Sequence, residues 1–477
     1  MSKLRTRRDF VKLTAAGVAG AALVDALPAS AQSMVNSKKP AGEIAVRLTT
    51  GEKRFAKEAP VQWRPAIAVA NAIALDPAKK FQDVLGFGAA FTDAACYMFN
   101  QLTPADREKL LHEFFHPTEL GLSVCRLCIG SSDYSTAAYT LDDGEADPEL
   151  KRFSIEHDKE YILPALRLGR KMNPELFLLG SPWSPPGWMK ANNSMLGGSF
   201  RKKYYEPYAN YFVKFLQAYA AEDVKVNAVT SQNEVDTDQD GRMPACLLGQ
   251  EYEIEFVGQH LGPAVEKAGL DTKIWLIDHN YNLWGRAICE LEDPKVNKYA
   301  DGIAWHGYAG GPEAMTRVHD AFPNKNAYWT EGGPDYTDPK YLTDWTKWSS
   351  MFAGILRNWS RCIIGWNLAL DEKGQPNIGP FPCGGVVTIN SQTKEITRSG
   401  QYWALAHYSK AIRRGAKRFD SQGITENVSH VAFENPDGSK AAVLTNTGDE
   451  KTVQLQMAGM TAEVVLPKDS VATLAWI

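Results

Sequence analysis

Short apolar runs of strand-forming residues alternate with longer amphipathic stretches through the middle of this chain. Such alternation is typical of repeated strand–helix units, and it argues against a division into three separate domains. Eight runs follow one another, at residues 83–90, 122–130, 176–182, 227–234, 273–280, 302–308, 327–331 and 362–370. Eight parallel strands with intervening helices predict an α/β fold, a closed (β/α)8 TIM barrel.

The stretches between the runs have the periodicity of helices. We expect helices within 103–115, 204–219, 249–268 and 342–357. The first has the strongest start signal, because Thr103 can cap it, Pro104 suits the first helical position, and Asp106 places an acidic group in the first turn.

Nearly every apolar run ends in polar or aromatic residues, among them Asp133, Trp183, Asn233, Glu234, His306, Glu331 and Trp366. In a barrel these ends surround one mouth, where active sites are built. An open doubly wound sheet would concentrate its site at one switch point and would normally carry a phosphate-binding loop. Residues 86–90 form only half of such a glycine-rich motif.

The flanks lack strand–helix units. Residues 43–78 and 411–477 read as alternating strands, and Pro436-Asp437-Gly438 predicts a hairpin turn between two of them. We therefore expect a barrel over residues 79–410 and a β-sandwich side domain built from both chain ends, with strands in 43–78 and in 411–477.

The N-terminus predicts export. Paired arginines, Arg7 and Arg8, precede a short Ala/Gly-rich apolar stretch and small residues at 29–31. These parts resemble a twin-arginine signal peptide over residues 1–31. We expect a periplasmic or secreted protein with no membrane span after signal cleavage.

Composition excludes some functions and leaves others open. The formal charge of -4 offers no basic surplus for nucleic-acid binding. The seven cysteines are an odd number, and Cys125 and Cys128 form a single CxxC inside an apparent strand. No second pair follows at zinc-ribbon spacing, so buried thiols are favoured over a metal site.

Two glutamates carry the candidate chemistry. Glu234 and Glu331 each follow directly after a buried strand, and Arg126 lies within apolar run two, where it can hold a carboxylate ionised. Paired carboxyls are what glycoside hydrolysis requires: one donates a proton to the leaving oxygen, and the other attacks the anomeric carbon or activates water. Candidate sugar-stacking rings are Trp183, Trp188, Trp305 and Trp366, and candidate hydroxyl-binding groups are Asp133, His306, Asn367 and Asn377.

Four strings carry a family resemblance: Gly86 to Ala94, Ser181 to Lys190, Gln232-Asn233-Glu234, and Gly365 to Leu370. Their order and content resemble glycoside hydrolase family 30, a clan A family of retaining β-glycosidases, and most closely its glucosylceramidase type. The likeness runs from about residue 40 to the C-terminus. It implies a barrel with a β-sandwich and retention at the anomeric centre.

The resemblance also implies residue roles. Glu234 matches the acid/base and Glu331 the nucleophile. The positions that match substrate-site residues are Arg126, Asp133, Trp183, Asn233, His306, Tyr308, Trp366 and Asn377. Departures lie around the mouth, at Gly307, at Gly332-Gly333-Pro334 and in the loop 381–385.

We therefore expect a β-glycoside hydrolase, exo- or endo-acting, with a carbohydrate or glycolipid substrate, no cofactor and no metal. The first expected substrate is a β-glucoside such as glucosylceramide, and the alternatives within the family are endo-β-1,6-glucanase, β-xylosidase or β-fucosidase activity. Alternatives from other classes are a metal-dependent barrel hydrolase and a non-catalytic carbohydrate-binding protein. For the acid/base role we expect the pKa of Glu234 to be raised.

Overall fold

The computed structural model describes residues 42–66 and 72–477. The predicted signal peptide at 1–31 lies outside the described residues. Within the described ranges, no helix combines the length and apolar character needed to cross a membrane.

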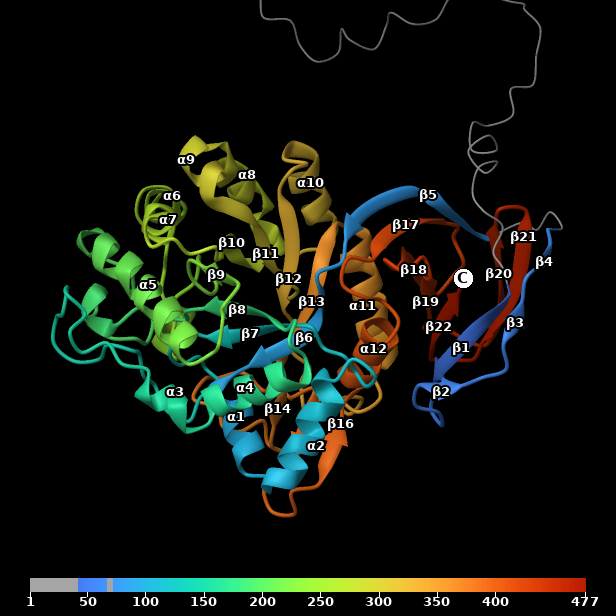
Figure 1. The fold of residues 1–477 in the computed structure, drawn as a ribbon, viewed down its shortest axis with the longest axis horizontal. Coiled ribbons are helices and arrows are strands. Elements are labelled where there is room, and N and C mark those ends of the chain that lie inside the picture. The colour runs from blue at the N-terminus through green and yellow to red at the C-terminus, as the bar shows by residue number, and fades with distance from the viewer. Residues whose placement is uncertain (1–41, 67–71) are drawn as a thin grey trace, which may run out of the picture.

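Eight parallel strands form a closed barrel, which confirms the predicted fold class (Figure 1). Each strand overlaps one of the eight apolar runs. Around the barrel they follow chain order: β6 (Gly86–Phe91), β7 (Val124–Cys128), β8 (Phe177–Ser181), β9 (Ala228–Thr230), β10 (Lys273–Asn280), β11 (Ala300–His306), β12 (Asn326–Glu331) and β13 (Ser360–Asn367).

Helices occupy the segments between the barrel strands, and one more follows the last strand. They are α1 (Asp93–Asn100), α2 (Pro104–Phe115), α3 (Glu156–Glu160), α4 (Ile162–Met172), α5 (Tyr205–Ala221), α6 (Gln250–Phe256), α7 (Gly262–Lys267), α8 (Trp284–Glu292), α9 (Pro294–Tyr299), α10 (Glu313–Ala321), α11 (Trp345–Arg357) and α12 (Gly400–Ser409). The predicted helix start is confirmed, because the Thr103 hydroxyl accepts a hydrogen bond from the Asp106 amide. The expected helix at 249–268 is α6 and α7 joined by a π-helical turn, Val257–Leu261.

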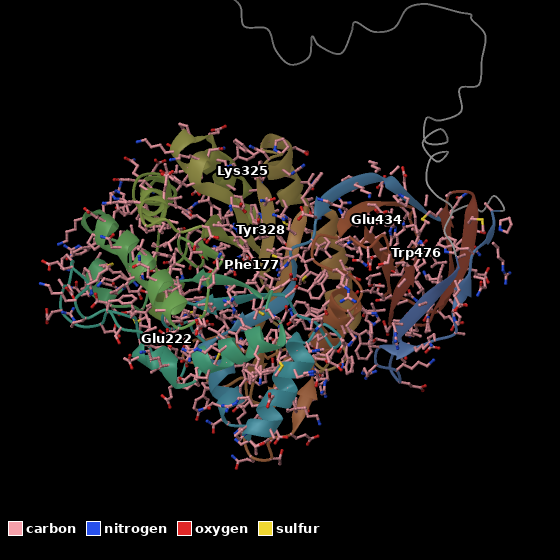
Figure 2. The ribbon with its side chains drawn as sticks, in the orientation of Figure 1. Phe177, Glu222, Lys325, Tyr328, Glu434 and Trp476 are labelled. Carbon is pink, nitrogen blue, oxygen red and sulfur yellow. The ribbon has the colours of Figure 1, made fainter. Side chains whose placement is uncertain are left out.

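Aromatic side chains help to fill the barrel below its mouth. Trp275 is stacked between Phe177 and Tyr328, with ring centroids 5.9 and 3.6 Å away and the planes nearly parallel. Figure 2 labels Phe177 and Tyr328 in the middle of the barrel. Inward-facing residues of this kind make the barrel a packed core rather than a pore, so a substrate can approach only at an end.

The side domain is built from strands of both chain ends (Figure 1). Strand β5 (Ile73–Asp83) lies between two C-terminal strands, antiparallel to β17 (Lys417–Gln422) and parallel to β20 (Lys451–Met457). The predicted hairpin turn connects two antiparallel neighbours that pair Glu434 with Lys440. The remaining strands are β1 (Glu43–Thr49), β2 (Ala56–Lys57), β3 (Val61–Gln62), β4 (Arg64–Pro65), β18 (Val428–Glu434), β19 (Lys440–Asn446), β21 (Met460–Leu466) and β22 (Ser470–Trp476).

Two barrel helices, α11 and α12, attach this domain. Trp345 of α11 donates its indole N–H to the carbonyl of Asp469, at 2.9 Å. Buried His407 of α12 lies 2.8 Å from the hydroxyls of both Thr49 and Thr473. The side domain is therefore fixed to the barrel by specific polar contacts as well as by packing.

Candidate active site

A cavity of about 470 Å3 opens at the carboxyl ends of the barrel strands. Glu234 and Glu331 both line it. The other lining residues come from the ends of the barrel strands and from the loops that follow them: Asp133, Trp183, Asn233, Thr237, Gln239, Met243, His279, Asn280, Tyr308, Gly333, Pro334, Asp335, Trp366, Phe381, Pro382 and Cys383. The short strands β14 (Ala369–Leu370), β15 (Val387–Ile389) and β16 (Ile396–Arg398) form a small sheet that anchors the loop carrying Phe381 to Cys383.

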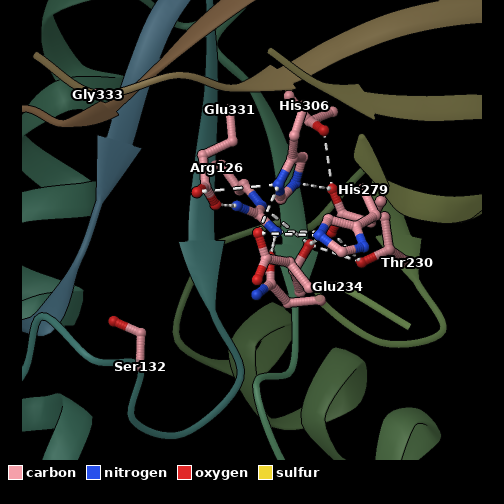
Figure 3. A network of polar contacts seen from close by, with 12 residues as sticks. Arg126, Ser132, Thr230, Glu234, His279, His306, Glu331 and Gly333 are labelled. Atoms are coloured by element: carbon pink, nitrogen blue, oxygen red, sulfur yellow. Dashed lines mark hydrogen bonds and ion pairs between the residues drawn. The ribbon is translucent and has the colours of Figure 1, made fainter. Parts of the chain in front are cut away.

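Glu331, the last residue of β12, is held from two sides. The Arg126 guanidinium donates a hydrogen bond to Glu331 Oε2 at 2.5 Å (Figure 3). The Tyr308 hydroxyl donates to Oε1 at 3.0 Å. Arg126 projects from β7 and has no solvent exposure. A guanidinium forms charge-assisted hydrogen bonds with a carboxylate and fixes its orientation, which a nucleophile needs.

Arg126 has a second carboxylate partner in Asp278, at 2.6 Å, and also donates to Asn233 Oδ1 at 2.6 Å. Burial raises the pKa of Asp278, but the charge of Arg126 and the hydrogen bond from His306 outweigh burial and hold that pKa well below its usual range. Burial lowers the pKa of Arg126, and the two carboxylates outweigh it and raise that pKa. Arg126 is therefore a permanent cation between two anions.

The rings of Trp183 and Trp366 stack on each other, with centroids 5.0 Å apart, and the Arg126 guanidinium lies 4.5 Å from the Trp183 centroid. Cation–π contacts of this kind stabilise a desolvated guanidinium. Both rings line the cavity, so one wall combines an aromatic surface with the buried charge behind it.

A distortion near the end of β10 brings two consecutive side chains to the site. Ile277 and Asp278 have φ values of +72° and +47°, and the pairing register with β11 shifts between Ile277 and His279. In a regular strand, neighbouring side chains point to opposite faces. Here the bulge lets Asp278 reach Arg126 while His279 reaches Glu234.

Glu234 follows β9 with a left-handed backbone, φ +54°, and its amide donates to the carbonyl of Asp278 at 3.0 Å. Its Oε1 lies 3.3 Å from a ring nitrogen of His279 and 3.3 Å from one of His306. Its Oε2 accepts a hydrogen bond from the Gln239 side chain at 2.6 Å. The two histidines therefore converge on one oxygen of Glu234 (Figure 3). The loop residue Gln239 fixes the other oxygen.

The expected raised pKa of Glu234 is wrong. Burial does raise it, but the contacts with His279 and His306 outweigh burial and lower the pKa below its usual range. The same contacts raise the pKa values of the two histidines. Burial lowers the pKa of His279, yet Asp236 and Glu234 raise it to about 10. Burial also lowers the pKa of His306, and the carboxylates of Glu331, Asp278 and Glu234 raise it.

The two candidate catalytic carboxyls lie close together. One oxygen of Glu234, one of Glu331 and a nitrogen of His306 all lie within 4.8 Å of one another. Retaining glycosidases separate their carboxyls by roughly 5–5.5 Å, and inverting enzymes by roughly 6.5–9.5 Å to make room for a water. The close approach fits retention. Because the guanidinium of Arg126 already balances Glu331, we assign these atoms to proton and nucleophilic chemistry rather than to a metal.

Of the eight positions expected to bind substrate, five line the cavity: Asp133, Trp183, Asn233, Tyr308 and Trp366. Arg126 and His306 are fully buried and do not line the cavity; they contact the carboxyls of Glu331 and Glu234. Asn377 is not among the lining residues. It stabilises the neighbouring loop by donating to the carbonyl of Phe381 and accepting from the amide of Gly379.

Other sequence candidates also have different roles. Trp305 is fully buried in the core, and buried Trp188 donates to the carbonyl of Asp142. Asn367 is buried and accepts from the Thr92 hydroxyl. In contrast, Asp133 lines the cavity, and burial together with the charges of Glu331 and Glu234 raises its pKa well above the usual range. A protonated Asp133 can donate to a sugar oxygen.

Sequence reasoning missed Asp278, His279 and Gln239. The first two were visible as polar residues at a strand end, but the bulge that directs both to the site leaves no sequence signal. Gln239 lies in an irregular loop, and its own φ is +52°. The prediction that Cys125 and Cys128 are buried thiols is confirmed, since both are buried and free.

A closed (β/α)8 barrel with two facing carboxyls at its carboxyl end is the arrangement of a retaining glycoside hydrolase. Sequence comparison agrees. The glycosyl hydrolase family 30 TIM-barrel domain matches residues 84–412, and the family 30 β-sandwich domain matches residues 415–474. The chain belongs to glycosyl hydrolase family 30, and it is a retaining glycoside hydrolase.

Curated relatives include enzymes with two kinds of substrate in their names. An endo-1,6-β-D-glucanase of Neurospora crassa is 33% identical over 389 residues, which cover 78% of this chain and 80% of the relative. The lysosomal acid glucosylceramidase of Mus musculus is 30% identical over 430 residues, covering 85% and 83%.

Among solved structures, the endo-β1,6-glucanase BT3312 superimposes with a TM-score of 0.83 at 32% identity, covering 91% of this chain and all of that chain. SrfJ from Salmonella typhimurium superimposes with a TM-score of 0.88 at 25% identity, covering 91% and 99%.

Proposed function

We propose that this enzyme hydrolyses β-glucosidic bonds by double displacement, with Glu331 as nucleophile and Glu234 as acid/base. The observation that carries the proposal is the pair of carboxyls within 4.8 Å across the cavity. Glu331, balanced by Arg126, attacks the anomeric carbon while Glu234 gives a proton to the leaving oxygen. Water then attacks the glycosyl-enzyme, Glu234 takes the proton of that water, and the bond to Glu331 breaks.

Azide rescue tests these roles. Glu331→Gly with azide should give the inverted α-glycosyl azide, because azide enters from the face that the nucleophile has vacated. Glu234→Ala should accumulate the glycosyl-enzyme and give the retained β-azide. Failure of both product patterns would show that the two roles are wrongly assigned.

For the substrate we infer a β-1,6-linked glucan first. Support comes from the relatives of similar length that are named endo-1,6-β-glucanases and from the mouth of the cavity. Position 307 has no side chain, and an added Cβ there would approach Trp329 to 2.9 Å. The bulky residue that glucosylceramidases place there therefore has no counterpart in this mouth.

Glucosylceramide is the second candidate, supported by the 30% identity to the mouse enzyme. We would measure kcat/KM on β-1,6-glucan, glucosylceramide and aryl β-glucosides, β-xylosides and β-fucosides. The expected order places β-1,6-glucan first. A higher kcat/KM on glucosylceramide would reverse the choice. We also expect turnover to be undiminished in excess chelator. A chelator-sensitive rate would favour the metal-dependent hydrolase. Binding of the sugar without turnover would favour a carbohydrate-binding protein.

We also propose that the twin-arginine-like segment exports the enzyme. The test is cell fractionation of the full chain beside a variant with both Arg7 and Arg8 replaced by lysine. Activity should appear outside the cytoplasm only for the unaltered chain. Equal export of both would contradict the proposal.

A further inference from the structure

His279 links Glu234 to a third carboxylate outside the catalytic pair. Its Nε2 lies 3.3 Å from Glu234 Oε1, and its Nδ1 contacts Asp236 Oδ1. The ring is 8% exposed and lines the cavity, so it lies beside the reaction space. The imidazole of His279 therefore lies between two carboxylates. His279 comes from the end of β10, and both carboxylates come from the loop that follows β9.

The two ring nitrogens have different partners. An ionised carboxylate only accepts hydrogen bonds, and contacts with His279 lower the pKa of Asp236 despite its partial burial. The ion pair with Asp236 therefore favours a ring that carries a proton on both nitrogens, and Nε2 faces Glu234. A second proton between Nε2 and Oε1 can be held by either atom.

Among the groups around Glu234, His279 is the one best placed to share this proton. Gln239 donates to Oε2, so that oxygen serves as an acceptor. His306, from β11, also approaches Oε1 and has a carboxylate partner of its own, Asp278, at 3.0 Å. His306 is fully buried, however, and of these two histidines only His279 lines the cavity, where it can exchange a proton with solvent. The remaining groups facing Glu234 and His279 are Glu331, Asp133 and Tyr308 across the cavity, and Arg286 of α8 acts on Asp236.

We propose that His279, backed by Asp236, is a positioning residue that stores the proton which Glu234 uses in catalysis. This inference rests on the proposed acid/base role of Glu234. In the resting enzyme the proton is on Nε2 and Glu234 is a carboxylate. As the glycosidic C–O bond breaks and the bond to Glu331 forms, the proton passes from Nε2 to Glu234 and from Glu234 to the leaving oxygen.

The second half-reaction restores the proton. A water oxygen bonds to the anomeric carbon while the bond to Glu331 breaks, the water proton moves to Glu234, and a proton returns to Nε2. One water is consumed over the cycle, and no oxidant, reductant or further reactant is needed. The stored proton would let Glu234 act as an acid at pH values where an isolated carboxyl has lost its proton.

The pH profile of His279→Gln tests the proposal. We expect the alkaline limb of kcat/KM on a glucoside with a poor leaving group to move down by at least about one pH unit, because Glu234 must then hold the proton alone. A dinitrophenyl glucoside needs little acid assistance, so its glycosylation step should keep the wild-type alkaline limb. Asp236→Asn should shift the limb in the same direction by less.

His260→Gln is the matched control, because His260 lies on the outer helices away from the cavity, and no shift is expected. An unchanged alkaline limb in His279→Gln would overturn the proposal. A loss that is equal at every pH and for both leaving groups would also overturn it, since that pattern indicates a structural role only. If Glu234→Gln itself showed no dependence on the leaving group, the proposed function would fail instead.

Discussion

The two carboxyls that face each other across the cavity are held by different kinds of partner. Glu331 is fixed by Arg126, whose charge does not change over the accessible pH range, and by the Tyr308 hydroxyl. Glu234 is fixed by two histidines, which titrate, and by a glutamine on a loop. One side of the site therefore has a permanent counter-charge, and the other has counter-charges that move with the proton.

This difference matches the two tasks of a double displacement. A nucleophile needs one charge state at the start of each cycle, and a guanidinium secures it. An acid/base must hold and release a proton within each cycle, which a permanent cation would oppose. The rigid strands β7 and β12 supply the first environment, whereas the second depends on the bulge in β10 and the loop after β9.

Substitution of Glu331 or of Glu234 should reveal the largest difference in kcat/KM between the two sides of the site. Glu331→Gln removes the attacking group, so we expect kcat/KM to fall by at least about 10⁴-fold for every leaving group. In Glu234→Gln, kcat/KM should fall by roughly 10²–10⁴-fold for poor leaving groups and far less for dinitrophenyl glucoside. The measurement is kcat/KM on a series of aryl glucosides, and an equal dependence on the leaving group in both variants would contradict the comparison.

Removal of the permanent charge should affect stability as well as rate. Arg126→Met leaves Glu331 and Asp278 buried without their partner, which should lower the free energy of unfolding by about 3–5 kcal/mol at pH 7. Arg126 depresses the pKa of Asp278. A group with a depressed pKa in the folded state adds stability above its unfolded pKa, near 4, and loses it as the pH falls further.

The gap in unfolding free energy between wild type and Arg126→Met should therefore stay constant from pH 7 to about pH 5 and narrow as the pH falls further toward 3. Urea unfolding at several pH values measures it. Arg126→Lys is the control, since it keeps the charge without the two-pronged geometry and should lose less stability. A gap that stayed constant down to pH 3 would show that Asp278 does not depend on Arg126 for its charge.

The sequence predicted the barrel well because its signal is repeated. Each strand is a short apolar run followed by a polar end, and eight repetitions outweigh any single ambiguity. Glu234, Glu331 and Arg126 were selected from the sequence for a related reason: each was predicted to lie within or directly after a buried strand.

The remainder of the site depends on irregular backbone. Residues 277 and 278 have positive φ, and this places Asp278 and His279 on the same side, against the alternation that sequence reasoning assumes. The direction of the Glu234 pKa shift could not be foreseen either, because it follows from histidines that approach from β10 and β11. Asn377 contacts its own loop and does not line the cavity, and nothing in the sequence shows which way that loop folds.

The smallest expected effect concerns the half-exposed partner of Glu331. Tyr308→Phe removes one hydrogen bond to Oε1 but leaves Arg126 on Oε2. A bond of this kind at a partly solvated position contributes about 1 kcal/mol, so kcat/KM should fall roughly 5-fold. The pH profile should keep its alkaline limb, because the proton that Glu234 uses is held by His279, which does not contact Tyr308. A shift of that limb in Tyr308→Phe would mean that the two sides of the site are coupled through the cavity, and the contrast between a permanent and a titrating environment would then have to be replaced by a single shared network.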